Sequence, residues 1–100
     1  MAFTVSEEHK SKIIALINAL APQAKIYLFG SRARGKNAEW SDIDLALDAG
    51  SALPESVIGE LNSIMEASNL PYKVDVLDFH HNISELMRQE ILKDKVVWKQ

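Results

Sequence analysis

Residues 29–47 read FGSRARGKNAEWSDIDLAL, and this stretch joins the end of one strand to most of another. Residues 25–29, KIYLF, lead into it and have the pattern of a strand buried on both faces. Gly30 interrupts that strand, and Ser31 can cap a short turn of helix that continues to about Lys36. From Asp42 to Asp48 large apolar residues alternate with aspartates and Ala46, which is typical of a strand with one buried face. The stretch therefore predicts two strands joined by a turn that begins at a glycine.

The rest of the chain supplies helices and further strands, and it shows no repeat or flexible linker. Apolar residues at helical spacing predict three helices. Their expected limits are Ser6 to Pro22, Pro54 to near Asn69, and Asn82 (with Glu85 as a capping-box partner) to about Asp94; the further strands are Lys73–Asp78 and a short Val96–Trp98. This order predicts a single α/β or α+β domain over residues 1–100, with a small mixed sheet of three to four strands covered by helices.

Length, charge and composition limit the possible classes of function. A chain of 100 residues buries a smaller fraction of its surface than a larger domain does, so a partner chain could supply further burial. Its net charge of -3 and pI near 5.5 argue against an extended nucleic-acid surface. It has no cysteine for disulfides or thiolate metal sites, and no run approaches the ~20 apolar residues of a membrane span. We therefore expect a cytoplasmic protein, without a membrane segment, that can form a homodimer or hetero-oligomer.

The turn after the first strand is a candidate anion site. Gly30 allows a ligand to approach the backbone closely, and N–H groups at the start of a helical turn favour negative charge. Arg32 and Arg34 follow directly and can pair with phosphate oxygens. A bulky side chain at position 30 is accordingly expected to block nucleotide without disturbing the nearby acids. The alternative is an ordinary strand-to-helix turn with Ser31 as a surface cap, which Gly-Ser alone fits equally well.

Two aspartates of the second strand are expected to share a face. The alpha carbons of Asp42 and Asp44 should lie about 7 Å apart, and two carboxylates about 6 Å apart repel by roughly 3 kcal/mol at an effective dielectric of about 20. Mg²⁺ would relieve this repulsion, because it takes oxygen ligands and keeps sites for water and phosphate. The alternative is an edge strand whose solvent-facing side happens to be acidic.

A third acid lies on the next expected strand. Asp75 stands between two valines that point to the core, so its own side chain should point to the other face. The alternative is an exposed acid that pairs with Lys73. Asp48 and Asp78 each close a strand, and we interpret them as turn residues.

Several other residues with chemical potential are assigned structural roles. His80 and His81 are adjacent and lack a His-x-x-x-His spacing, so solvent-facing or capping imidazoles are favoured over zinc ligands. Trp40 is expected to cover the edge of the sheet rather than stack on a base. Met65 and Met87 are expected in the cores of their helices.

These segments together resemble a known superfamily. A Gly-Ser turn, ten intervening residues, Asp-x-Asp and a later strand aspartate resemble the DNA polymerase beta-type nucleotidyltransferases. Residues 29–47 are especially similar to the minimal nucleotidyltransferases, and the similarity extends from Ile26 through the strand KVDVLD and the final helix. The resemblance implies the nucleotidyltransferase fold.

The resemblance also implies a set of site residues. Gly30 and Ser31 would hold the triphosphate, while Arg32 and Arg34 match basic positions whose roles vary within the group. Asp42, Asp44 and Asp75 would bind one or two Mg²⁺ ions and catalyse transfer from a nucleoside triphosphate, with Asp75 as an alternative general base.

The family further implies a partner. Minimal nucleotidyltransferases act beside an all-helical HEPN-domain protein, so the resemblance implies transfer of AMP from ATP to a tyrosine of such a toxin, with this chain as antitoxin. The segment 82–94 and Trp98 are candidates for the contact. Two alternatives stay open: a subunit that neutralises its partner by binding alone, and a small-molecule nucleotidyltransferase completed by a second subunit.

Overall fold

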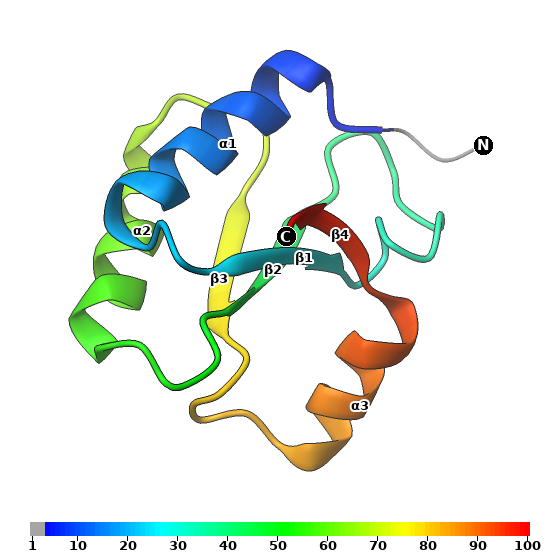
Figure 1. The fold of residues 1–100 in the computed structure, drawn as a ribbon. Helices are drawn as coiled ribbons and strands as arrows, with labels where there is room; N and C mark the ends of the chain where they lie inside the picture. Colours follow the sequence, from blue (N-terminus) through cyan, green and yellow to red (C-terminus); the bar gives the residue numbers. More distant parts are fainter. Residues whose placement is uncertain (1–3) are drawn as a thin grey trace.

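The computed structural model describes residues 4–100 as three helices and four strands. Their order and limits are α1 (Glu7–Leu20), β1 (Lys25–Phe29), β2 (Ile43–Asp48), α2 (Glu55–Ala67), β3 (Val74–Asp78), α3 (Glu85–Asp94) and β4 (Val96–Lys99) (Figure 1). The short terminal strand predicted at 96–98 is confirmed. No helix within residues 4–100 has the length and apolar character needed to cross a membrane.

The four strands form one mixed sheet in the order β3-β2-β1-β4. β1 is antiparallel to both β2 and β4, whereas β2 and β3 run parallel. The parallel pair is connected by α2, as a parallel crossover requires. Both the mixed character and the number of strands agree with the prediction.

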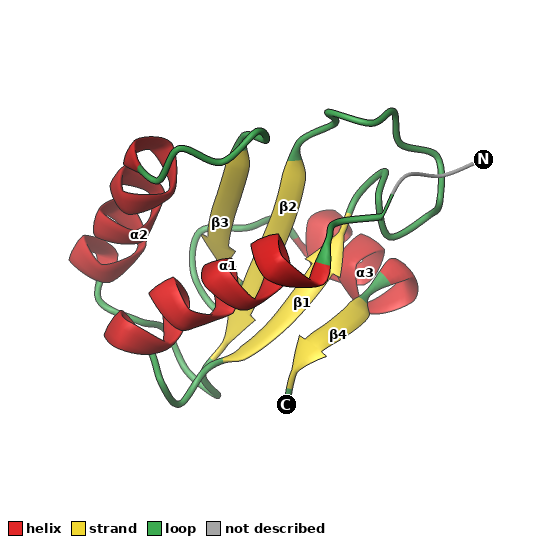
Figure 2. Ribbon diagram, turned by 90° about the horizontal axis from the view of Figure 1, so that it is seen from above, coloured by secondary structure: helices red, strands yellow, loops and turns green. Residues whose placement is uncertain are grey.

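The two faces of the sheet have different covers. Ile26, Ile43 and Leu45 lie on one face, in a core to which α1 and α2 contribute residues such as Ile17 and Leu61. Figure 2 shows α1 in front of the sheet and α2 beside β3.

The second face carries a smaller core, in which Tyr27, Ala46 and Phe79 pack with Ile91 of α3. Figure 2 shows α3 on the side of the sheet opposite α1. Because side chains alternate along a strand, the residue two positions before Ala46, Asp44, belongs to this second face. The single helix α3 leaves the start of β2 and β3 on this face without a helical cover within residues 4–100.

The N-cap of α1 agrees with the prediction, whereas the N-cap of α3 differs from it. The hydroxyl of Ser6 accepts a hydrogen bond from the His9 amide, so Ser6 caps α1 as expected. For α3 the predicted capping box at Asn82 is wrong: Ser84 is the N-cap, and its hydroxyl accepts from the Met87 amide. Asn82 instead has a φ of 59°, a left-handed conformation that asparagine tolerates in turns.

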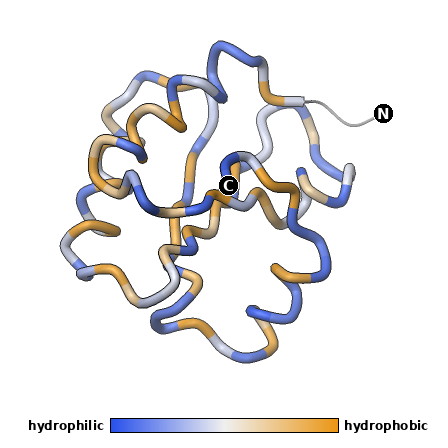
Figure 3. Tube along the Cα trace, viewed as in Figure 1, coloured by the Kyte–Doolittle hydropathy of each residue, from blue (hydrophilic) through white to orange (hydrophobic). Residues whose placement is uncertain are grey.

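The apolar stripe of α3 is only partly buried. Met65 of α2 is buried as predicted, but Met87 is 40% exposed and Leu86 is 70% exposed. Figure 3 shows hydrophobic colour interrupting the hydrophilic α3. The prediction for Met87 was wrong, because periodicity identifies the apolar side of a helix but not whether another element covers it.

One edge of the sheet is blocked by a side chain. Asn62 of α2 donates its amide to the Val76 carbonyl and accepts from the Val76 amide, both at 2.9 Å. Val76 is the central residue of the edge strand β3. Its outward hydrogen-bonding groups are therefore occupied, as native edge strands require.

Candidate metal and nucleotide site

Three aspartates lie near the start of β2 and β3, close enough for Asp42 and Asp75 to act on the charge of Asp44. Asp44 and Asp75 are direct partners in the parallel register, so they occupy adjacent strands at the same level. Neighbouring strands lie about 4.8 Å apart, which brings these two side chains together on the face that carries α3. Asp42 lies in the loop directly before β2, because the strand begins at Ile43 rather than at Asp42 as predicted. We call Asp42, Asp44 and Asp75 the acid site.

The acid site is electrostatically unfavourable without a cation. Burial raises the pKa of Asp44 above its ordinary value of 3.8, and repulsion from Asp75 and Asp42 raises it further, while Arg34 and Lys73 lower it in part. Lys73 forms an ion pair with the acid site, through Nζ at 3.9 Å from Asp75 Oδ1. That contact is the alternative role considered for Asp75, and its length and exposure make it weak.

The three carboxylates share one region but do not form a ready ligand cage. Within residues 4–100 no three histidine, cysteine, aspartate or glutamate side chains are arranged so that they could hold a metal ion. The donor chemistry nevertheless fits Mg²⁺, which is bound through one or two carboxylates together with water and substrate phosphates. A divalent cation would stabilise these carboxylates, because besides burial their mutual repulsion raises the pKa of Asp44, and the cation would offset that repulsion.

Gly30 begins the turn that flanks the acid site. Its φ is 78°, and a Cβ placed on it would lie 2.6 Å from Asp44 Oδ2, a distance that side chains do not tolerate. Phe29, directly before it, pairs with Asp44 across the antiparallel β1–β2 ladder. The backbone at position 30 therefore lies against the Asp44 carboxylate. The expectation that a bulky residue here would spare the acids was wrong, because it would press on Asp44 first.

The segment 30–36, which we call the glycine turn, is a series of hydrogen-bonded turns and not the short helix that was predicted. The Arg34 amide donates to the Gly30 carbonyl at 3.1 Å, and the Lys36 amide donates to the Ser31 carbonyl at 2.9 Å. Ser31 is half-buried between them. With so few aligned peptides, a helix dipole adds little here, and anion binding would depend on individual N–H groups and on the arginines.

The two arginines of the glycine turn have different surroundings. Arg34 is exposed and forms an ion pair with Asp94 of α3, with Nη1 at 3.2 Å from Oδ2. Arg32 is only 8% exposed. Its Nε donates to the Ser41 carbonyl at 3.0 Å, and its Nη2 donates to the Glu39 carbonyl at 2.8 Å. Arg32, predicted as a phosphate contact, therefore directs its guanidinium toward the loop before Asp42.

An aromatic partner of Arg32 was missed in the sequence. The Arg32 guanidinium lies over the Tyr72 ring at 4.9 Å from its centroid. Trp40 packs against the same ring, with centroids 5.8 Å apart, yet Trp40 stays 59% exposed. Trp40 therefore contacts Tyr72, in the segment just before β3, and remains largely exposed to solvent. Nothing in the spacing of positions 32, 40 and 72 indicates this cluster, because the contacts depend on how two loops fold.

A pocket of about 360 Å³ opens beside the glycine turn. Its wall combines residues of the turn with residues of α3: Phe29, Gly30, Arg34, Ser84, Leu86, Met87, Glu90 and Asp94. The exposed apolar residues of α3 thus lie next to the candidate nucleotide site.

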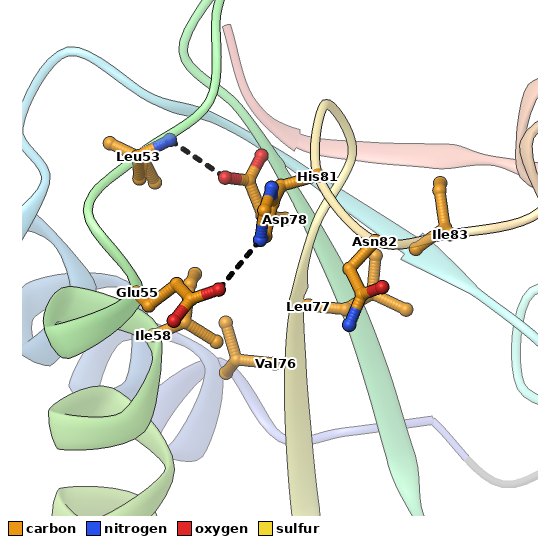
Figure 4. A pocket seen from close by; sticks show the side chains of 9 residues that line it. All are labelled: Leu53, Glu55, Ile58, Val76, Leu77, Asp78, His81, Asn82 and Ile83. Atoms are coloured by element: carbon orange, nitrogen blue, oxygen red, sulfur yellow. Dashed lines mark hydrogen bonds and ion pairs between the residues drawn. The ribbon is translucent and has the colours of Figure 1, made fainter.

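The two histidines lie at the other end of β3 from the acid site, and His81 lines a separate pocket there. His81 Nε2 lies 2.9 Å from Glu55 Oε1, and the buried Asp78 accepts from the Leu53 amide at 2.7 Å; these residues line a pocket of about 260 Å³ (Figure 4). His80 Nε2 lies 2.6 Å from Asp48 Oδ1. Both imidazoles have carboxylate partners, so the expectation of solvent-facing or capping side chains was incomplete.

The carboxylates that close β2 and β3 act in turns, as predicted. Asp48 Oδ1 accepts from the Gly50 amide and Asp78 Oδ1 accepts from the His80 amide, each at 2.9 Å and each two residues along the chain. Burial alone would raise the pKa of Asp48, but the Gly50 amide and the His80 ring lower it overall. These acids are therefore stabilised by the fold itself, in contrast to Asp44.

Known proteins are similar to this chain in sequence and in fold. The family described as "Polymerase beta, Nucleotidyltransferase" matches residues 11–100. A Haemophilus influenzae protein named "Probable protein adenylyltransferase MntA" is 32% identical over 93 residues, which cover 93% of this chain and 81% of that protein.

Two solved structures with similar chains are of toxin–antitoxin pairs. A toxin–antitoxin structure with AMP-PNP contains a chain that is 32% identical, with a TM-score of 0.73 and coverage of 89% of this chain and 71% of that one. A second structure, of a tri-AMPylated Shewanella oneidensis HEPN toxin in complex with MNT antitoxin, contains a chain that is 29% identical, with a TM-score of 0.69 and coverage of 92% and 70%.

Proposed function

This chain belongs to the polymerase beta nucleotidyltransferase family, and from that membership we propose that it is an adenylyltransferase that acts as the antitoxin of a HEPN-type toxin. In this proposal it transfers AMP from ATP, with Mg²⁺, to a tyrosine hydroxyl of the helical partner. The similar chains that occur in complexes with a toxin support the partner, and the AMPylated state of one such toxin supports the reaction. A cytoplasmic location is part of the same proposal, because ATP and the proposed partner would both be met there.

The observation that carries the proposal is the juxtaposition of Gly30, Asp44 and Asp75. Asp75 faces Asp44 in register, and the Gly30 backbone lies against the Asp44 carboxylate. A triphosphate bound at the glycine turn would thus lie beside carboxylates that gain from a divalent cation. The two alternatives considered from the sequence, an ordinary strand-to-helix turn and a solvent-facing acidic strand, do not require the turn and the acids to lie together.

The proposed reaction assigns a task to each residue. Mg²⁺, held by Asp42, Asp44 and Asp75, would offset the charge of the triphosphate and lower the pKa of the acceptor hydroxyl. Ser31 and backbone N–H groups of the glycine turn would orient the phosphates. Asp75, whose side chain is 49% exposed, is accessible to the proton of the tyrosine hydroxyl.

Bond changes in the transfer are balanced without any further reactant. The tyrosine oxygen forms a bond to the α-phosphorus, and the bond between that phosphorus and the bridging oxygen to the β-phosphate breaks. Pyrophosphate leaves with the electron pair, and the hydroxyl proton passes to Asp75 or to water. Arg34, exposed and held by Asp94 at 3.2 Å, is the proposed basic contact for the phosphates.

The exposed apolar residues of α3 and β4 are the proposed contact surface for the partner. We call Leu86, Met87, Leu92, Val96 and Val97 the α3–β4 surface; each is at least 40% exposed. Leu86, Met87 and Leu92 belong to the segment 82–94 that was predicted for this contact. Trp98, predicted with it, is half-buried under Lys10, so we propose the two valines before it in its place. Leu86 and Met87 also line the pocket beside the glycine turn, and exposed apolar side chains next to such a site are typical of protein contacts.

A second candidate function is neutralisation by binding alone, with nucleotide absent or purely structural. The observation that favours it is that the acid site does not converge into a metal cage within residues 4–100. In that case the α3–β4 surface would be sufficient for function and the acids dispensable.

Intact-mass measurement separates these functions. The purified chain is incubated with its helical genomic neighbour, ATP and Mg²⁺, and then with Asp42→Asn or Asp44→Asn in place of the wild type. We expect the partner to gain one or more adenylyl masses with the wild type and none with either variant.

A matched control is Glu60→Gln, which removes an exposed carboxylate from α2, away from the acid site, and should leave transfer unchanged. An unmodified partner that is silenced by one equivalent of this chain would favour the binding function. An adenylyl mass gained only by added small molecules would favour a small-molecule nucleotidyltransferase instead.

A further inference from the structure

Asp42 is the member of the acid site that β-sheet pairing does not hold. Strand β2 begins one residue later at Ile43, whose amide donates to the Lys73 carbonyl at 2.9 Å. Asp42 itself is exposed and follows the loop 37–41. Its position relative to Asp44 therefore depends on how this loop is fixed.

Arg32 fixes the loop through two nearby carbonyl contacts. Its Nε and Nη2 donate to the carbonyls of Ser41 and Glu39, at 3.0 and 2.8 Å. The Ser41 carbonyl belongs to the peptide that leads directly into Asp42. A planar guanidinium can make both contacts at once, whereas a lysine ammonium lacks this fork geometry. The loop is also closed internally, since the Ala38 amide donates to the Ser41 hydroxyl at 2.8 Å.

The same guanidinium contacts the segment that leads into β3. Tyr72 lies beneath it at 4.9 Å, and Tyr72 stands three residues before Asp75. The Tyr72 hydroxyl is in turn 3.3 Å from Nδ1 of His9 in α1. Arg32 thus connects the loop before Asp42 with the loop before Asp75, and helix α1 anchors the connection.

We infer that Arg32 is a positioning residue that sets the separation of Asp42 from Asp44 and Asp75, and so tunes the affinity of the acid site for a divalent cation. This inference rests on the proposed function, because it takes the acid site to be a metal site. It assigns Arg32 to the carboxylates, through the loop, and leaves the phosphate contact to Arg34.

The test measures cation binding directly, so it does not need transfer activity. Mn²⁺ replaces Mg²⁺ as the probe, and its binding to the full chain is followed by the loss of the free-ion signal in electron paramagnetic resonance. Arg32→Lys keeps the charge but loses the fork, and Arg32→Gln loses both. We expect each to raise the Mn²⁺ concentration for half-saturation by about tenfold or more, as loss of an outer-shell partner does in other metal sites.

Two controls separate positioning from other effects. Lys25→Gln removes an exposed charge at the end of β1 that is far from the glycine turn, and it should leave Mn²⁺ binding unchanged. ATP binding in the presence of EDTA should also be unchanged in Arg32→Lys. If an Arg32 variant does not fold, as judged by circular dichroism, Tyr72→Leu weakens the same connection from the other side and should raise the half-saturation concentration as well.

The outcomes distinguish the inference from the function beneath it. Unchanged Mn²⁺ binding in folded Arg32→Lys, with Asp42→Asn binding weakly, would overturn the positioning role alone. A loss of metal-free ATP affinity with unchanged Mn²⁺ binding would return Arg32 to the phosphate contacts. If Asp42→Asn binds Mn²⁺ as the wild type does, the proposed metal site itself fails, and the inference fails with it.

Discussion

Gly30 has a backbone and a space requirement that only glycine satisfies. Its φ of 78° is strained for residues with a side chain, and a Cβ would lie 2.6 Å from Asp44 Oδ2. We expect Gly30→Ala to lower the free energy of unfolding by about 1–2 kcal/mol and to impair transfer, because Asp44 must move. Urea unfolding and the intact-mass assay measure the two effects.

Gly59 offers a matched glycine in the same chain. It lies inside α2, and a Cβ there meets nothing within 4 Å. Gly59→Ala should therefore raise the free energy of unfolding, by about 0.5–1 kcal/mol, through helix propensity. Equal effects of alanine at positions 30 and 59 would contradict the role given to Gly30.

Asp44 gives the acid site a defined pH dependence. Because its pKa is raised above 3.8 in the folded state, the folded chain holds this proton more tightly than the unfolded chain does. The protonated Asp44 carboxyl thus contributes its full share to the free energy of unfolding below pH about 3.8. This contribution is lost as the pH rises through the pKa of Asp44 in the folded chain. Asp44→Asn should accordingly melt at a higher temperature than the wild type at pH 7 without metal, and the difference should vanish at low pH.

Added Mg²⁺ should reverse the comparison at pH 7. The cation binds the ionised wild-type site and stabilises the folded chain by mass action, but it gains less from the neutral amide of the Asp44→Asn variant. Thermal melting with and without Mg²⁺ measures both effects. A wild type that is already more stable than Asp44→Asn in EDTA would mean that the acid site is not under repulsive strain.

At the scale of elements, the start of α3 provides a direct comparison of two caps. Ser84 accepts from the Met87 amide at 3.1 Å, whereas Asn82 lies in a left-handed turn outside the helix. Ser84→Ala should cost about 1 kcal/mol of unfolding free energy, and Asn82→Gly should stay within a few tenths, since glycine adopts a positive φ freely. Urea denaturation checks both, and the reverse ranking would restore Asn82 as the cap.

Sequence periodicity predicted the elements well because it reports which side of each element is buried. The alternation from Asp42 to Asp48 placed Asp44 on the correct face, and the valines beside Asp75 placed that acid likewise. The contacts by which Arg32 fixes the loop before Asp42 could not be predicted. The contacts of Arg32 run to main-chain carbonyls and to the ring of Tyr72, far along the chain, and carbonyls carry no sequence signal.

At the scale of the whole molecule, the α3–β4 surface predicts how the chain behaves with its partner. Leu86 is 70% exposed, so Leu86→Gln should change the unfolding free energy of the isolated chain by no more than about 0.5 kcal/mol. The same change should weaken binding to the helical partner by about tenfold or more, as loss of a buried contact does. Calorimetric titration of the two proteins measures this.

Ala67→Gln is the matched control for this surface. It places the same polar side chain at an exposed position of α2, distant from α3, and should leave partner affinity unchanged. Equal affinities of wild type and Leu86→Gln would move the contact to another face of the molecule.

The hydrogen bonds between Asn62 and Val76 have a consequence for self-association. A sheet with an unpaired strand at each edge can bind strands of other copies on both sides and so polymerise. A sheet with only one unpaired edge strand can bind one further copy. With the centre of β3 occupied by Asn62 and α2 lying beside it, recruitment is directed to β4. When two copies pair through β4, neither has another unpaired edge strand, so association stops at a dimer and does not continue into a fibre.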